Sequence, residues 1–110
     1  MSADTMKRIQ EVADLWNQHS AASFPDALRM MEIDGGDAIL LDATVAGCVQ
    51  TFLAKQGKLD LWRTSTLGLC YGDLARWTAE TSGKELKYLK RLQEMARLVL
   101  KFVLERSKPN

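Results

Sequence analysis

The sequence predicts a mainly α fold, a compact bundle of four principal helices with a short hairpin or ordered loop between the first and second. Apolar residues recur at helical spacing over most of the 110 residues. Capping residues and glycines mark the ends of these segments. A single segment, about 30–41, lacks the helical pattern. The length corresponds to one domain, residues 1–110.

The first helix is predicted from about Asp4 to His19. Its apolar residues fall largely on one face, as expected for a helix packed against a core. A small, polar stretch over residues 18–23 ends it. Pro25 then favours a short turn or helical stub that reaches Arg29. The apolar face is formed by Met6, Ile9, Ala13 and Trp16, widened by Val12 and Leu15.

Residues 30–41 carry a turn signal in place of helical spacing. Gly35 and Gly36 are adjacent and flanked by Asp34 and Asp37. Glycines and aspartates between short apolar arms are typical of a β-hairpin. Because the arms are short, an ordered loop is the alternative interpretation, and a hairpin would have to pack against the helices.

Two further helices are predicted from Asp42 to about Gln56 and from near Asp60 to about Thr81. Asp42 is a suitable N-cap, and Gly57 is the expected glycine after a helix end. Both helices carry small residues on one face, which suggests that they pack closely as an antiparallel pair; a kink is the alternative. These small residues are Ala43, Gly47 and Ala54 on one helix and Gly68, Gly72, Ala75 and Ala79 on the other.

The last segment, Ser82 to Lys108, shows the clearest amphipathic pattern. Ser82 and Glu85 have the spacing of a capping box. One side is apolar, with Leu86, Leu89, Leu92, Met95, Ala96, Val99, Leu100 and Val103. The other side is basic, with Lys87, Lys90, Arg97 and Lys101. The pattern predicts one long helix with a buried face and a basic face.

The net charge of +1 hides a separation of charge along the chain. Residues 1–60 contain nine acidic and five basic residues, whereas residues 84–110 contain eight basic and three acidic ones. We favour a basic helix that complements its acidic neighbour within the fold or within a dimer. The alternative is a basic surface for an acidic partner.

Cysteine content and hydropathy bear on the compartment. Cys48 and Cys70 do not form a disulfide framework, which favours a reducing environment. The polar N-terminal residues do not resemble a signal peptide, and the apolar runs are too short to span a membrane. We therefore expect a cytoplasmic protein without membrane contact, with both cysteines buried and reduced among apolar residues.

Candidate catalytic and metal-binding groups are sparse. His19 is the single histidine, with no recognisable base or orienting group nearby in sequence, and a partly exposed structural role is expected. Carboxylates gather at Glu32, Asp34, Asp37 and Asp42, but their spacing does not match a calcium loop. Phosphate-binding, nucleophile-elbow and zinc motifs are missing from the sequence. We expect no enzyme activity, no cofactor and no metal.

The leading function is a non-catalytic protein-interaction module, such as an adaptor, a small regulator or an immunity-type inhibitor. It is expected to form a homodimer and to bind another protein. The apolar surface exceeds what one buried face requires, and the candidate interface is Trp62, Leu98, Phe102 and Leu104.

Two other function classes stay open. The first is a nucleic-acid-binding regulator that uses Lys87, Lys90, Arg97 and Lys101. It is disfavoured because Glu94 can pair with its basic neighbours on the helix. The second is a small-ligand sensor with an apolar pocket among Trp16, Trp62, Trp77 and the methionines.

Overall fold

The computed structural model describes residues 1–106 and confirms the mainly α fold. Its four principal helices are α1 (Ala3–Ala21), α3 (Ala38–Ala54), α4 (Leu61–Ala79) and α5 (Gly83–Arg106). A short helix, α2 (Asp26–Arg29), follows Pro25 as expected from the sequence. The predicted end of the last helix, Lys108, lies outside the described residues. Within residues 1–106, no helix is both long and apolar enough to cross a membrane.

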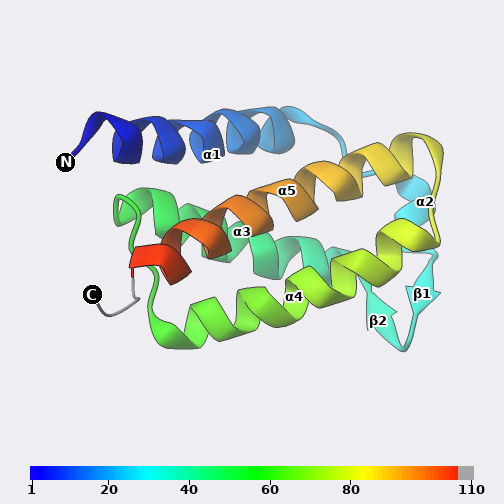
Figure 1. Cartoon of the computed structure of the whole chain (residues 1–110). Helices are drawn as coiled ribbons and strands as arrows, with labels where there is room; N and C mark the ends of the chain where they lie inside the picture. Colours follow the sequence, from blue (N-terminus) through cyan, green and yellow to red (C-terminus); the bar gives the residue numbers. More distant parts are fainter. Residues whose placement is uncertain (107–110) are drawn as a thin grey trace.

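Helix α5 lies at the centre of the bundle, between α1 and α4 and in front of α3 (Figure 1). Consecutive helices α3, α4 and α5 run antiparallel to one another, joined by short turns. Helix α1 is antiparallel to α5, and an ion pair of 2.9 Å between Arg8 and Glu105 joins their outer ends. The long amphipathic helix predicted from the sequence is thus the element on which the others pack.

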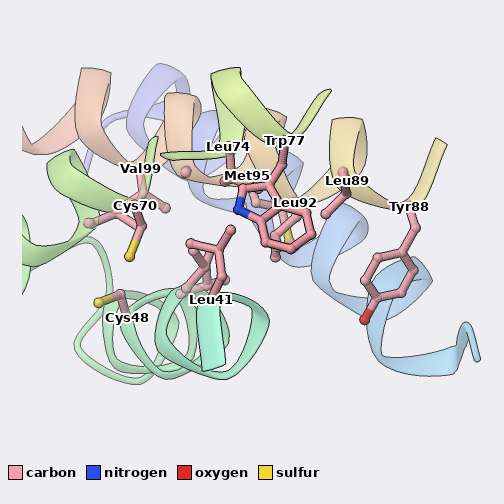
Figure 2. Packing of buried hydrophobic residues seen from close by; sticks show 14 of the residues in the cluster. Leu41, Cys48, Cys70, Leu74, Trp77, Tyr88, Leu89, Leu92, Met95 and Val99 are labelled. Atoms are coloured by element: carbon pink, nitrogen blue, oxygen red, sulfur yellow. The ribbon is translucent and has the colours of Figure 1, made fainter. Parts of the chain in front are cut away.

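The core is formed by one face of each principal helix (Figure 2). On α5 the predicted apolar stripe is confirmed, since Leu89, Leu92 and Val99 are at most 1% exposed. On α4, Leu67, Leu74 and Trp77 are buried. Burying side chains of this size is the main source of stability in a domain of this length.

The glycine-rich segment does form a hairpin, but a shorter one than predicted. Strands β1 (Glu32–Ile33) and β2 (Gly36–Asp37) pair antiparallel. The turn is made by Asp34 and Gly35, both with positive φ, and not by the two glycines. This is the Asp-Gly pair that a tight hairpin turn favours.

Helix α3 begins earlier than predicted. Its N-cap is Asp37, whose carboxylate accepts hydrogen bonds from the backbone N–H groups of Ile39 and Leu40. The predicted second arm of the hairpin is therefore the first turn of α3. Asp42, the expected N-cap, lies within the helix, and its carboxylate contacts His19 instead.

The turn between α3 and α4 depends on Gly57. Its φ is +95°, in the region that favours glycine. A Cβ atom at this position would lie 2.8 Å from the ring of Phe102 and 3.1 Å from Ile9. The turn is therefore held tightly between α1 and α5.

The small residues of α3 and α4 do not form the contact between the two helices, so that part of the prediction is wrong. Gly47, Gly68 and Gly72 are exposed, and a Cβ atom at any of them would meet nothing within 4 Å. The helices do pack as an antiparallel pair, through buried residues that include Cys48 and Cys70. The small residues face outward, and α4 continues through both of its glycines without a break.

Candidate functional site

Most of the large exposed apolar residues of the helices lie on α3 and α4, and Met6 on α1 and Leu104 on α5 are the exceptions. Exposed fractions are 66% for Leu40, 81% for Leu61, 70% for Trp62 and 74% for Leu69, and Ile39 is also exposed. We call this set, together with the small residues Gly47, Gly68 and Gly72, the α3–α4 face. Leu40 lies near Asp73 and Arg76 towards the end of α4, whereas Leu61 and Trp62 lie at its start. Exposed large apolar residues that gather on one side of a molecule mark interaction sites more often than scattered ones do.

The composition of α3 explains how this surface arises. Asp42 is the single charged residue between Ala38 and Ala54. The inward side of α3 is buried through Val45, Val49 and Phe52. Its outward side is also largely apolar, and helices that are apolar on every side are usually covered on every side.

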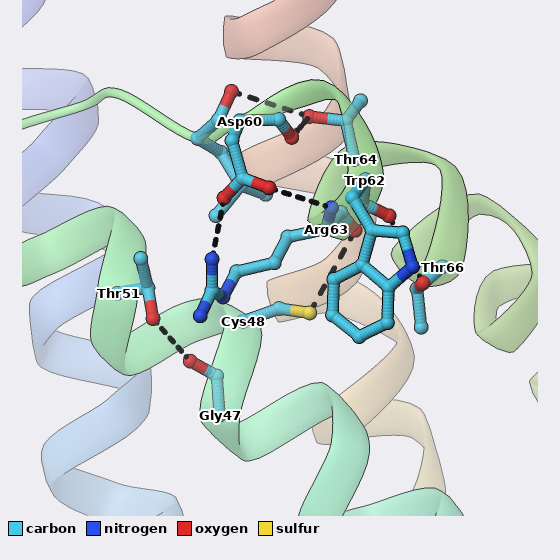
Figure 3. Close-up of polar contacts among 9 residues, drawn as sticks. Gly47, Cys48, Thr51, Asp60, Trp62, Arg63, Thr64 and Thr66 are labelled. Carbon is cyan, nitrogen blue, oxygen red and sulfur yellow. Dashed lines mark hydrogen bonds and ion pairs between the residues drawn. The ribbon is translucent and has the colours of Figure 1, made fainter.

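The polar residues near Trp62 are engaged with one another. Asp60 caps α4, accepting a hydrogen bond from the backbone N–H of Arg63 at 3.2 Å and one from its guanidinium at 2.7 Å (Figure 3). These hydrogen bonds lower the pKa of the Asp60 carboxyl. The Arg63 guanidinium also lies 5.9 Å from the centre of the Trp62 ring. Asp60 and Arg63 thus neutralise each other, whereas Lys55 and Lys58, which line the same recess, form no ion pair among residues 1–106.

At the other end of the face, one arginine is shared by two carboxylates, which leaves one negative charge. Arg76 forms ion pairs with Asp73, one turn away, and with Asp34 of the hairpin at 3.0 Å. The hairpin is thereby fixed to α4. Between these two charged groups the surface of α4 presents Ser65, Gly68, Leu69 and Gly72, none of which is charged.

The four residues of the predicted interface do not lie together. Trp62 is exposed on α4, and Leu104 is 51% exposed on α5. Leu98 is half-buried against the core, and Phe102 is 2% exposed and packs edge-on against Phe52. Phe102 is a core residue, so its assignment to a partner surface is wrong. The sequence pattern could not show that α1 covers this side of α5.

The predicted basic residues Lys87, Lys90, Arg97 and Lys101 are all exposed on α5. Glu94 pairs with Arg97 at 2.5 Å, as the spacing indicated. The hydrogen bond from Arg97 lowers the pKa of the Glu94 carboxyl. The basic side of α5 is thus interrupted by an internal ion pair.

Both cysteines are buried, as predicted, and neither is in a disulfide. Their thiols lie on the facing sides of α3 and α4 (Figure 2). The Cys48 thiol donates a weak hydrogen bond to the carbonyl of Arg63 at 3.7 Å. Burial raises the pKa of Cys48, and burial together with the neighbouring Cys48 raises the pKa of Cys70 to about 11. Such thiols are poor nucleophiles at neutral pH.

His19 is 4% exposed, so the expectation of a partly exposed histidine is wrong. Its Nε2 atom lies 2.8 Å from a carboxylate oxygen of Asp42, and its Nδ1 atom accepts a hydrogen bond from Arg91 Nε at 3.2 Å. The ring of Tyr88 lies against it, with centroids 4.4 Å apart. We call His19, Asp42, Tyr88 and Arg91 the His19 cluster.

The other sequence candidates are placed apart. Asp34 and Asp37 have the structural roles described above, and residues 1–106 contain no group of three metal-ligating side chains. Trp16 is half-buried on α1, Trp62 is exposed and Trp77 is buried at the far end of α4. The three tryptophans therefore do not line one pocket.

Comparison with known proteins adds no relative. No protein-family model matches the chain, and neither a curated protein nor a solved structure is significantly similar to it. Any functional statement must therefore come from the geometry of the molecule.

Sequence reasoning missed Ile39, Leu40, Leu61 and Leu69 as interface candidates. A signal was present, because α3 has apolar residues on all sides and Leu59 and Leu61 closely precede Trp62 in sequence. The His19 cluster was also missed, since its members are 23 and 72 residues apart. Separations of that size leave no local pattern.

Proposed function

We propose that this chain is a non-catalytic protein-interaction module that forms a homodimer through the α3–α4 face. The observation that carries the proposal is the concentration of Leu40, Leu61, Trp62 and Leu69 on the outer side of two adjacent helices. Tryptophan is among the residues that contribute most to binding when an interface buries them.

The spacing of large and small residues on α4 favours a second copy of the chain as the partner. In an antiparallel pair of α4 helices centred on Ser65, residue 61 faces residue 69 and residue 62 faces residue 68. Leu61 then meets Leu69 of the other copy, and the Trp62 ring covers the bare backbone at Gly68. The same surface thus supplies both the protruding side chain, Trp62, and the flat backbone at Gly68 that it covers, as a two-fold interface requires.

The charges around the face also favour self-association. Asp60 is paired with Arg63 within one chain, and Arg76 is shared by Asp73 and Asp34, which leaves one negative charge at that end. In an antiparallel pair that end lies opposite the Asp60–Arg63 end of the other copy. Two copies can therefore approach without bringing like charges together, which would cost several kcal/mol. A strongly charged partner would gain little from this surface.

Two features support a non-catalytic role. Both ring nitrogens of His19 are engaged within the chain, so the ring offers no free base to a substrate. Both thiols are buried with raised pKa values and are not activated nucleophiles.

Sedimentation velocity of three variants tests the proposed dimer. We expect Leu69→Glu to give monomers, because it places a charge at the proposed contact with Leu61. Trp62→Ala should weaken the dimer at least about tenfold, as loss of a buried aromatic anchor does. Leu104→Glu on α5 is the matched control and should leave the dimer intact. A wild-type monomer at high micromolar concentration contradicts the proposal, and monomers from Leu104→Glu alone would place the interface on α5.

A cysteine at Ser65 tests the register. Ser65 is exposed and would face its own copy across the two-fold axis. Ser65→Cys should form an intermolecular disulfide under mild oxidation, since the Cβ atoms need to be only about 4 Å apart. Ser20→Cys, exposed at the end of α1, is the control and should not cross-link. Equal cross-linking of the two variants would indicate random collision and contradict the register.

A further inference from the structure

At the far end of the bundle from Trp62, a pocket opens between residues 22–26 and the first turns of α5. Its volume is about 570 Å³, within the range of small-molecule sites. Phe24 and Pro25 form one wall, and Lys84, Lys87, Tyr88 and Arg91 form the other. The pocket shares no residue with the α3–α4 face.

The charge in this pocket is unbalanced. Lys84, Lys87 and Arg91 line it, and among residues 1–106 none of the three forms an ion pair. In the part of the chain that the structure describes, Asp26 is the one carboxylate that lines the pocket, and its side chain is fully exposed. Its Oδ1 atom lies 3.7 Å from Nε of Arg29, a residue that does not line the pocket. Three cations directed at one recess leave a strong positive potential, which attracts a multiply charged anion.

Arg91 differs from an ordinary surface arginine because its position is fixed. Its Nε donates to His19 Nδ1 at 3.2 Å, and its guanidinium carbon lies 5.5 Å from the centre of the Tyr88 ring. Since an arginine always donates, His19 Nδ1 is an acceptor and the ring proton is on Nε2, where it is donated to Asp42. Asp42 on α3 thus orients His19 on α1, and His19 orients Arg91 on α5.

Tyr88 also helps to fix the position of Arg91, but its hydroxyl does not point into the pocket. Burial, the nearby charge of Asp42 and a hydrogen bond to that carboxylate raise the pKa of the Tyr88 hydroxyl. The hydroxyl therefore stays protonated and is directed at Asp42. The Tyr88 ring, in edge contact with Phe24 at 5.4 Å between centroids, forms the floor on which Arg91 rests.

A buried cluster of this kind is weak evidence of a stabilising role. Burying a histidine with a carboxylate is costly, and an apolar pair of the same volume often serves at least as well. What the cluster does is hold the Nε side of Arg91, leaving the outer edge of its guanidinium without a protein acceptor in the described chain. That edge binds two oxygens of one anion at once.

We propose that this pocket binds the phosphate group of a small organic phosphate ester, with Arg91 as the bidentate contact and Lys84 and Lys87 completing the site. A phosphate dianion matches three cations better than a carboxylate does. Phe24 and Pro25 contact the organic part of the ligand. A phosphate polymer is disfavoured because the Glu94–Arg97 pair interrupts the basic side of α5 beyond the pocket.

An NMR titration of the full chain tests the site. The ¹⁵N-labelled protein is titrated with phenyl phosphate at constant ionic strength, and both amide and arginine Nε signals are followed. We expect saturable shifts at Arg91 Nε and at residues 22–26, with inorganic phosphate binding more weakly because it lacks a group to contact Phe24. Absence of saturation at roughly 20 mM, well above a millimolar affinity, overturns the proposal.

Charge variants separate a formed site from a diffuse basic surface. Arg91→Gln should raise the Kd about tenfold or more, the loss expected for a charge-assisted pair. Lys87→Gln, an exposed change that should not affect folding, should raise it about threefold by removing one cation. Arg97→Gln on the same helix is the matched control and should change it less than about twofold. Equal losses from Arg97→Gln and Lys87→Gln would contradict the proposal.

Two further comparisons test the ligand class and the role of His19. Benzoate should bind several-fold more weakly than phenyl phosphate, and equal affinity contradicts the phosphate assignment. His19→Gln should broaden the Arg91 Nε signal through faster exchange with water and weaken binding, because the guanidinium is no longer held. An unchanged Nε signal with unchanged affinity would show that His19 does not position Arg91.

Discussion

Helices α3 and α5 differ in the kind of residue that they expose to solvent. On α5 most exposed residues are charged, among them Lys87, Lys90, Arg97 and Lys101, and Leu104 is the one large apolar residue of Gly83–Arg106 that is exposed. On α3 large apolar residues, Ile39 and Leu40, are exposed, and the neighbouring α4 exposes Leu61, Trp62 and Leu69. The surface of α5 is therefore mostly charged, whereas the α3–α4 face exposes large apolar side chains, which we propose a second copy of the chain covers.

The largest contrast should appear when one leucine is removed from each region. Leu92→Ala on α5 should destabilise the fold by about 2–5 kcal/mol, because Leu92 is fully buried and its loss leaves a cavity. Leu69→Ala on α4 should change the stability of the monomer by less than about 0.5 kcal/mol. Urea denaturation at low protein concentration measures both. A large loss from Leu69→Ala would show that the α3–α4 face is part of the core.

The glycines offer a second contrast. Gly57→Ala should cost at least about 2 kcal/mol, from its positive φ and from the contact with Phe102. Gly68→Ala should stabilise the isolated fold by up to about 1 kcal/mol, because it lies mid-helix with open space around it. Thermal melts of dilute samples compare them. Equal destabilisation by both variants would contradict the outward orientation of Gly68.

The contact between α3 and α4 should weaken at alkaline pH. The pKa of Cys70 rises from 9.0 to about 11 on folding, so the folded state holds the thiol proton more tightly. This contribution to stability is complete below the ordinary thiol pKa and is lost as the pH rises toward the folded value. Melting temperatures measured from about pH 8 to about pH 11 should fall.

Cys70→Ala is the control for the alkaline effect. It should cost around 1 kcal/mol at neutral pH and should show a smaller alkaline loss than the wild type. Tyr88, whose pKa is also raised by burial and by Asp42, should account for much of the alkaline loss of stability that remains in this variant. Rapid reaction of either thiol with iodoacetamide in the native protein would contradict the burial on which this expectation rests.

The smallest effect is expected on the charged side of α5. Glu94→Gln removes the partner of Arg97, an exposed pair within one helix, and should cost less than about 0.5 kcal/mol. Because the pKa of Glu94 is lowered, its contribution is present above the ordinary carboxyl pKa and is lost as the pH falls through the folded value. Denaturation at low and high salt measures it. A loss of stability as large as that expected for Leu92→Ala would show that the charged side of α5 is not a solvated surface.

The sequence was most informative where one physical rule decided the outcome. The amphipathic pattern of α5 predicted its buried residues because helical periodicity alone determines which positions face the core. The predicted start of α3, at Asp42, is wrong because Asp37 and Asp42 are equally good N-caps. The apolar run between them has no clear helical period. Hydrogen bonds to Ile39 and Leu40 decide in favour of Asp37.

The candidate sites were harder to predict, for a different reason. Small residues indicate that something can approach a helix closely, but they do not say whether it comes from the same chain. Gly68 and Gly72 were therefore assigned to an internal contact, whereas they lie outside. Phe102 is predicted at a partner surface because the residues that cover it, Phe52 of α3 and Arg8 of α1, lie far from it in sequence.

The His19 cluster has a consequence for the order of folding. Helices α3, α4 and α5 follow one another closely, so they can pair early through local contacts. Helix α1 packs mainly on α5, and the bond between His19 and Arg91 spans 72 residues. We expect α1 to dock last and to detach first. Native-state hydrogen exchange should then show α1 opening at lower free energy than α5, with the Arg91 Nε proton exchanging together with α1.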